Sequence, residues 1–207
     1  MSNAWRAKVV DARTRCRVEL ALLAFFTPLY IAFGPRGMLI HMALAGLLLG
    51  YILADARYTR AFVWVAPGGS VRERWRGSLV TLIPLTLTTL VAFVALGVTQ
   101  GAQLDPIAIT SRLLVYMAWA LVQQTLFQFY LLGRLLRAAP GLPPAVLIAL
   151  SGLSYGLVHL PDLQLTVLTC IAGVIWTADY YRHRLLLTVA ASHALLGTAY
   201  YAFIGIY

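Results

Sequence analysis

The stretch "LVTLIPLTLTTLVAFVALGV", residues 79–98, carries no charged side chain and decides the fold class. A helix needs about 20 predominantly apolar residues to cross the hydrocarbon core of a bilayer. The rest of the chain has the same character, since 61% of its 207 residues are hydrophobic and only 11% are charged. Soluble domains carry roughly 25% charged residues. The sequence therefore predicts an all-α, polytopic membrane protein.

Apolar segments of this kind recur along the chain, separated by loops that contain glycine and proline. We predict about seven transmembrane helices, with six to eight compatible with the pattern, although the second and fifth segments are short. They would form a single domain over residues 19–207, preceded by a basic cytoplasmic segment, 1–18, whose opening "MSNA" is typical of a tag remnant. The segments are approximately 19–34, 38–54, 79–98, 112–133, 143–160, 163–181 and 185–205.

The chain has a formal net charge of +9, which could suggest a nucleic-acid partner. The basic residues instead gather at the ends of alternate apolar segments, where they act as topology signals. We therefore predict no nucleic-acid partner, a cytoplasmic N-terminus and an external C-terminus. The basic stretch "SVRERWRGS" (70–78) fits either an interfacial amphipathic helix or an ordinary loop. Fourteen of the sixteen basic residues lie on the predicted cytoplasmic side: Arg6, Lys8, Arg13, Arg15, Arg17, Arg57, Arg60, Arg72, Arg74, Arg76, Arg134, Arg137, Arg182 and Arg184.

Strongly polar side chains interrupt three of the predicted spans. Such residues are costly inside a membrane and usually face a bundle interior or a cavity. A pair of glutamines can simply bond one helix to another. Two histidines on different helices, together with glutamines on a third, instead predict an enclosed polar site, because imidazole can act as acid or base near neutral pH. The residues are Gln123, Gln124 and Gln128 on the fourth segment, Ser151, Tyr155, His159 and Asp162 on the fifth, and Ser192 and His193 on the seventh.

The order and spacing of these residues resemble the CAAX protease and bacteriocin-processing (CPBP, or Abi) family of intramembrane endopeptidases. Its signature is EExxxR, then FxxxH, then HxxxN, on three separate transmembrane helices. The resemblance covers roughly residues 110–205. The corresponding stretches are "QQTLFQ" (123–128), "YGLVH" (155–159) and "HALLG" (193–197), with similar flanks in "HLPD" (159–162) and "FQFYLLGRLL" (127–136).

The resemblance implies a helical-bundle protease that cuts a membrane-embedded or lipidated peptide in or beside the lipid bilayer. It also implies that a motif glutamate, helped by histidine, activates water, while the other histidine and the asparagine stabilise the oxyanion. This chain departs from that pattern. The motif positions hold His159 and His193 unchanged, Tyr155 for phenylalanine, Gln123 and Gln124 for the glutamates, Gln128 for arginine and Gly197 for asparagine.

Two functions remain open for such a chain. A neutral amide has no useful basicity, so a working hydrolase would need a histidine as its base. We predict that His159, oriented by Asp162, is this base, that Gln123 or Gln124 positions water, and that His193 acts on the oxyanion or leaving group. The alternative is a catalytically inactive module that binds or scaffolds a membrane peptide or lipidated protein.

No metal or cofactor is predicted for this site. Two histidines without a carboxylate or thiolate make a poor zinc site, which normally has three or four protein ligands. The Arg-, Ala- and Leu-rich composition suits a GC-rich bacterium and hence a bacterial inner membrane.

Overall fold

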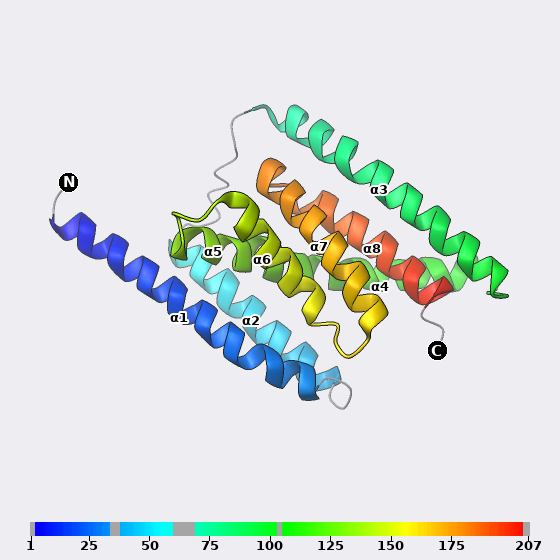
Figure 1. Cartoon of the computed structure of the whole chain (residues 1–207), viewed down its shortest axis with the longest axis horizontal. Helices are drawn as coiled ribbons and strands as arrows, with labels where there is room; N and C mark the ends of the chain where they lie inside the picture. The colour runs from blue at the N-terminus through cyan, green and yellow to red at the C-terminus, as the bar shows by residue number, and fades with distance from the viewer. Residues whose placement is uncertain (1–2, 34–37, 60–68, 103–104, 205–207) are drawn as a thin grey trace. The chain divides into compact units, whose positions relative to one another are not determined.

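The computed structural model of the chain is built of helices, and the all-α prediction is confirmed for the part that it describes, residues 3–33, 38–59, 69–102 and 105–204 (Figure 1). No strand occurs in these ranges. A π-helical segment, η2 (Thr125–Leu131), joins α4 to α5. The α-helices are α1 (Asn3–Phe33), α2 (Met38–Thr59), α3 (Val71–Thr99), α4 (Pro106–Gln124), α5 (Leu132–Ala138), α6 (Pro144–Leu157), α7 (Leu163–His183) and α8 (Leu186–Phe203).

The helices follow the seven apolar segments of the sequence, because α4, η2 and α5 form one helical run, Pro106–Ala138. Four described runs are long and apolar enough to cross a membrane: Val71–Thr99, Pro106–Ala138, Leu163–His183 and Leu186–Phe203. The chain is thus a helical integral membrane protein. A membrane crossing by each of the seven segments and a cytoplasmic N-terminus stay predictions.

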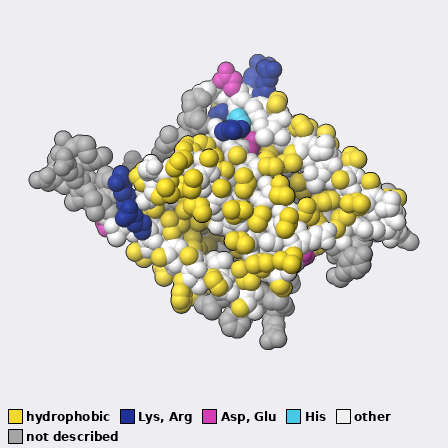
Figure 2. Space-filling view, viewed as in Figure 1, with side chains coloured by type: hydrophobic (Ala, Val, Ile, Leu, Met, Phe, Trp, Pro, Cys, Tyr) yellow, Lys and Arg dark blue, Asp and Glu magenta, His cyan; other side chains and the backbone are white. Residues whose placement is uncertain are grey.

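The described surface suits a lipid environment. Figure 2 shows hydrophobic side chains over most of the visible face. Large apolar residues such as Leu47, Val80 and Leu114 are 72%, 68% and 71% exposed. A contiguous apolar surface of this extent is unusual on a soluble monomer and is expected where lipid tails cover the protein.

The basic stretch 70–78 is helical and not a loop, because it forms the N-cap and first part of α3, whereas an interfacial position stays a prediction. Ser70 is the N-cap, and its hydroxyl accepts the N–H of Glu73 at 3.2 Å. The Glu73 carboxylate accepts the N–H of Ser70 at 2.7 Å, which completes a capping box. Similarly, α1 begins at Asn3 and includes most of the basic segment 1–18. The predicted loop residues 34–37, 60–68 and 103–104 lie outside the described ranges.

The residues group into two compact units, which are described separately. Unit 1 comprises Met1–Val63 and Leu126–Ala178, and unit 2 comprises Trp64–Thr125 and Asp179–Tyr207. In unit 1, α5 packs against α1 and α6, whereas in unit 2, α8 packs against α3 and α4. Helices α6 and α7 approach closely at Gly152, where a Cβ would lie 2.5 Å from Cα of Val174. Small residues permit such backbone contact between membrane helices.

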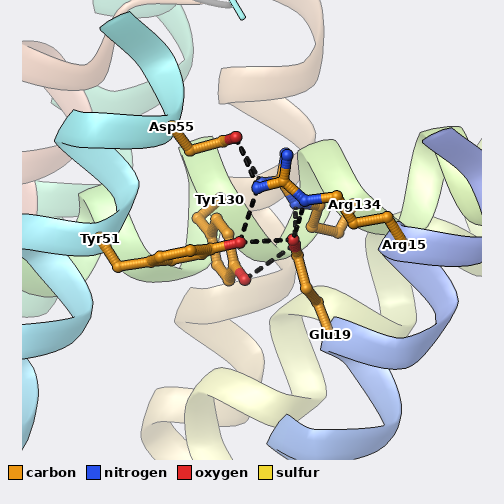
Figure 3. A network of polar contacts seen from close by, with 6 residues as sticks. All are labelled: Arg15, Glu19, Tyr51, Asp55, Tyr130 and Arg134. Carbon is orange, nitrogen blue, oxygen red and sulfur yellow. Dashed lines mark hydrogen bonds and ion pairs between the residues drawn. The ribbon is translucent and has the colours of Figure 1, made fainter. Parts of the chain in front are cut away.

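A closed ring of alternating charges joins α1, α2 and α5 in unit 1 (Figure 3). Arg15 places Nε 2.9 Å from Oε1 of Glu19 and Nη2 2.6 Å from Oδ1 of Asp55. The second oxygen of each carboxylate binds Arg134: Nη2 donates to Oδ2 of Asp55 at 2.6 Å, and Nε donates to Oε2 of Glu19. We call these four residues the ion ring. Its two arginines are matched by two carboxylates, so none of the four charges is left unpaired.

Two tyrosines complete the hydrogen bonding of the ion ring (Figure 3). The Tyr51 hydroxyl donates to Oε1 of Glu19 at 2.6 Å, and the Tyr130 hydroxyl donates to Oε2 of the same residue at 3.0 Å. The Arg134 guanidinium also lies over the Tyr130 ring, 4.7 Å from its centroid. Since Tyr130 belongs to η2, the ring holds the π-helical segment as well as α5.

Candidate functional site

The three motif glutamines lie where the α-helix widens into a π-helix. Gln123 and Gln124 are the last residues of α4, and Gln128 is in η2. π-helical segments are rare and are frequently found at functional sites. The sequence offers no pattern that predicts this widening, so this feature of the site was missed.

Several amide atoms of these glutamines are buried without a hydrogen-bond partner among the described residues. They are Oε1 of Gln123, Oε1 of Gln124 and both Oε1 and Nε2 of Gln128. The side chains of Gln124 and Gln128 are fully enclosed, at 0% exposure. An unsatisfied buried polar group costs about 1–3 kcal/mol. Such groups are uncommon in native proteins, and four of these atoms belong to the three motif glutamines.

One glutamine meets one of the predicted catalytic histidines, within unit 2. Nε2 of Gln124 lies 3.2 Å from Nδ1 of His193, which is 3% exposed. An amide nitrogen can only donate, so Nδ1 of His193 accepts this hydrogen bond. The proton of the neutral imidazole therefore sits on Nε2. His193 thus carries a hydrogen-bond donor at Nε2, held in that tautomer by Gln124.

The surroundings of His193 are set by the close packing of α8. On the α3 side, Ser192 Oγ and Thr86 Oγ1 form a hydrogen bond of 2.7 Å. On the α4 side, Tyr116 meets the His193 ring edge to face, with centroids 5.5 Å apart and planes at 88°. Gly197 admits this tyrosine, because a Cβ at position 197 would lie 2.3 Å from its Cε1 atom. The glycine at the last motif position therefore makes room for an aromatic ring.

His159 lies in unit 1, in the turn that follows α6. Its Nδ1 atom is 3.1 Å from the carbonyl oxygen of Tyr155 and 3.3 Å from that of Gly156. The Thr169 hydroxyl is also 3.3 Å from Nδ1. Carbonyl oxygens only accept, so Nδ1 carries the proton and Nε2 of the neutral ring holds a lone pair. His159 is thus the opposite tautomer to His193.

The other polar residues of the fifth segment support η2 and the turn that follows α6. Ser151 donates to the carbonyl oxygen of Phe127 at 3.2 Å, which ties α6 to the π-helical segment. Tyr155 is fully buried, with its ring 5.0 Å from that of Phe127 and 5.6 Å from that of His159. Asp162, predicted to orient the His159 ring, accepts the N–H of Leu165 at 2.9 Å at the start of α7. Backbone carbonyls hold the imidazole.

Within the described ranges, no three or more His, Cys, Asp or Glu residues are grouped so that they could hold a metal ion. The motif side chains comprise one imidazole with a lone pair at Nε2, one imidazole with a proton at Nε2, and several amides.

Comparison with known protein families gives one match. The family described as type II CAAX prenyl endopeptidase, Rce1-like, matches residues 105–199. This range begins one residue before α4 and includes Gln123, Gln124, His159 and His193. No curated protein and no solved structure matched the chain.

Proposed function

We propose that this chain, which is similar to the Rce1-like type II CAAX prenyl endopeptidases over residues 105–199, hydrolyses a peptide bond next to a prenylated cysteine at the membrane. The observation that supports hydrolysis most directly is that the two motif histidines are opposite neutral tautomers. His159 has a lone pair at Nε2 because backbone carbonyls bind its Nδ1–H, and His193 has its proton at Nε2 because Gln124 donates to its Nδ1. Hydrolysis of an amide needs one group of each kind.

In this proposal His159 is the general base. Its Nε2 accepts a proton from water as the water oxygen attacks the scissile carbonyl carbon. The carbonyl oxygen becomes an oxyanion that accepts a hydrogen bond from Nε2 of His193. The carbon–nitrogen bond then breaks, and protonated His159 returns its proton to the leaving amine. The products are a carboxylic acid and an amine, and the enzyme regains its starting state.

The glutamines have supporting roles in the same reaction. Gln124 fixes the tautomer of His193, and the unpartnered amide atoms of Gln123 and Gln128 are suited to orient water or the peptide backbone. No motif carboxylate is present, so an imidazole replaces the carboxylate base that the resemblance implies. A general base contributes about 10²–10⁴-fold to the rate. We therefore expect slower turnover than that of an enzyme with the motif glutamates. We propose a bacterial cytoplasmic membrane as its location.

Cleavage of a farnesylated peptide ending in a CAAX sequence, measured with the full chain in liposomes, tests the proposal. We expect the native protein to release the terminal tripeptide. His159→Ala and His193→Ala should each lower the rate at least about 10²-fold, as expected for loss of a base or an oxyanion donor. Gln123→Glu and Gln124→Glu show whether a restored carboxylate increases the rate.

A different pattern would support the alternative function. If the native protein and both histidine variants bind the peptide equally well and none of them cleaves it, hydrolysis is excluded. The chain would then be an inactive family member that binds lipidated peptides.

A further inference from the structure

Tyr116 is an aromatic residue of α4 that the motifs do not include. It lies eight residues before Gln124, a little more than two turns along the helix. Both contact His193 of α8: Gln124 through the hydrogen bond to Nδ1, and Tyr116 through the edge-to-face ring contact. His193 is therefore in contact with two residues of α4.

The position of the Tyr116 hydroxyl follows from Gly197. A Cβ built at Gly197 would lie 2.5 Å from Cζ and 2.7 Å from Oη of Tyr116. The hydroxyl thus occupies the space in which any larger residue at position 197 would begin its side chain. Gly197 is one helical turn from His193, so the hydroxyl lies on the same part of α8 as the imidazole.

This hydroxyl has no hydrogen-bond partner among the residues that the structure describes, although the tyrosine is half-buried. The hydroxyls of Tyr51 and Tyr130, in contrast, both donate to Glu19. The Tyr116 hydroxyl is therefore available to a bound molecule beside His193.

We infer that the Tyr116 hydroxyl is a second hydrogen-bond donor to the oxyanion, acting beside Nε2–H of His193; this rests on the proposed hydrolysis. A tyrosine hydroxyl is one of the groups that enzymes use for this purpose. The bond gains strength as the carbonyl oxygen becomes negatively charged, so Tyr116 accelerates the chemical step rather than binding the substrate more tightly.

Tyr116→Phe tests the role directly, because it removes the O–H and keeps the ring that packs on His193 and Gly197. We expect kcat for the farnesylated peptide to fall about 10²-fold, with KM unchanged. Tyr201→Phe is the matched control, since its ring lies 6.0 Å from that of Tyr116. It should keep the native kcat. Equal rates for Tyr116→Phe and the native protein would overturn the inference and leave the proposed hydrolysis intact.

A second variant moves the hydroxyl without removing it. Gly197→Ala places a methyl group within 2.3 Å of the Tyr116 ring and must displace it. We expect a loss of kcat comparable to that of Tyr116→Phe. Gly50→Ala is the control, because a Cβ there meets no atom within 4 Å. Should Gly197→Ala fail to fold, Tyr116→Phe decides alone.

Binding of a tetrahedral mimic separates this inference from the proposed function. The probe is the farnesylated peptide with a phosphinate in place of the scissile amide. We expect Tyr116→Phe to bind the phosphinate at least about tenfold more weakly than the native protein, and the uncut amide peptide equally well, because only the phosphinate carries the negative oxygens. If Tyr116→Phe weakens phosphinate binding in this way but the native protein cleaves no peptide, the Tyr116 hydroxyl is a donor to the negative oxygen and the proposed hydrolysis is rejected. Phosphinate binding that is absent, or unaffected by Tyr116→Phe, would overturn the inference.

Discussion

The ion ring and the motif glutamines are both polar clusters in a hydrophobic chain, yet they satisfy their polar groups in opposite ways. In the ion ring, each carboxylate uses both oxygens to bind both arginines. In the motif there is no charge, and amide atoms of three glutamines are buried without a partner in the described ranges. A fully satisfied buried network specifies structure, whereas unsatisfied groups concentrate at sites of function. The charged cluster is therefore satisfied within the protein, whereas the neutral cluster keeps amide atoms without a partner in the described ranges.

The two clusters share one helical run. Gln128 lies in η2, Tyr130 follows two residues later, and Arg134 belongs to the adjoining α5. The hydrogen bonds of Tyr130 and Arg134 to Glu19 hold the run directly after the motif. The part of the run that the ion ring stabilises thus follows directly after the motif glutamines, whose amides include atoms without a hydrogen-bond partner in the described ranges.

The largest effect is expected from Arg134→Met. This substitution leaves Glu19 and Asp55 as neighbouring carboxylates, with the half-exposed Arg15 as the remaining cation of the ion ring. Breaking a buried pair by removing one member costs about 3–5 kcal/mol of unfolding free energy. Unfolding in mixed detergent micelles measures it. The control is Arg137→Met, an exposed arginine one turn on, which should change the unfolding free energy by about 0.5 kcal/mol or less. Equal losses would show that the ring has no special role.

The double variant Glu19→Gln with Arg134→Met tests whether Glu19 and Arg134 stabilise the protein as a pair. It removes one negative and one positive charge, so Arg15 and Asp55 still form a pair. We expect the double variant to be more stable than the sum of its single variants, with a coupling of about 1–3 kcal/mol in a double-mutant cycle. Additive losses would mean that the members of the ring act independently.

Gln128→Leu tests whether an unpartnered motif amide contributes to stability. It exchanges an unpartnered amide for an apolar side chain of similar size, which removes the desolvation cost. We expect the unfolding free energy to stay the same or to rise by up to about 2 kcal/mol, while cleavage of the farnesylated peptide slows. A marked loss of stability would show that Gln128 is a structural residue and that its amide is satisfied in the membrane.

The smallest effect is expected from Tyr51→Phe. It deletes the hydrogen bond that the Tyr51 hydroxyl donates to Glu19 and the one that it accepts from Arg15, and leaves all four charges of the ring in place. The expected loss is about 1 kcal/mol of unfolding free energy. The same unfolding assay measures it, with Tyr201→Phe as the control. A loss as large as that of Arg134→Met would indicate that the tyrosine hydroxyls, and not the ion pairs, hold the ring together.

The helices could be predicted from the sequence because hydropathy is a local property. The stretch 79–98 needs no partner to be identified as a membrane helix, and it lies within α3. The pairing of Gln124 with His193 was also predictable, since the spacing of three motifs placed both residues in one site. The catalytic roles of His159, His193, Gln123 and Gln124 stay predictions.

The ion ring could not be predicted, because it depends on residues that are remote in sequence. Glu19 and Arg134 are 115 residues apart, and each looks like an ordinary charge at the end of an apolar segment. The contact between Tyr116 and Gly197 is hidden for the same reason. The π-helical segment has no residue signature at all, since it reflects how the surrounding side chains pack. Long-range packing, and not local preference, determines these features.

The origin of the ion ring's carboxylates also bears on how the protein folds and evolves. Glu19 and Asp55 come from α1 and α2, outside the matched residues 105–199, whereas their partner Arg134 lies inside that range. A fragment that began at residue 105 would bury a guanidinium with neither of its counterions. Residues 105–199 therefore take both counterions of Arg134 from α1 and α2, and a neutral residue at position 19 or 55 would remove one of them.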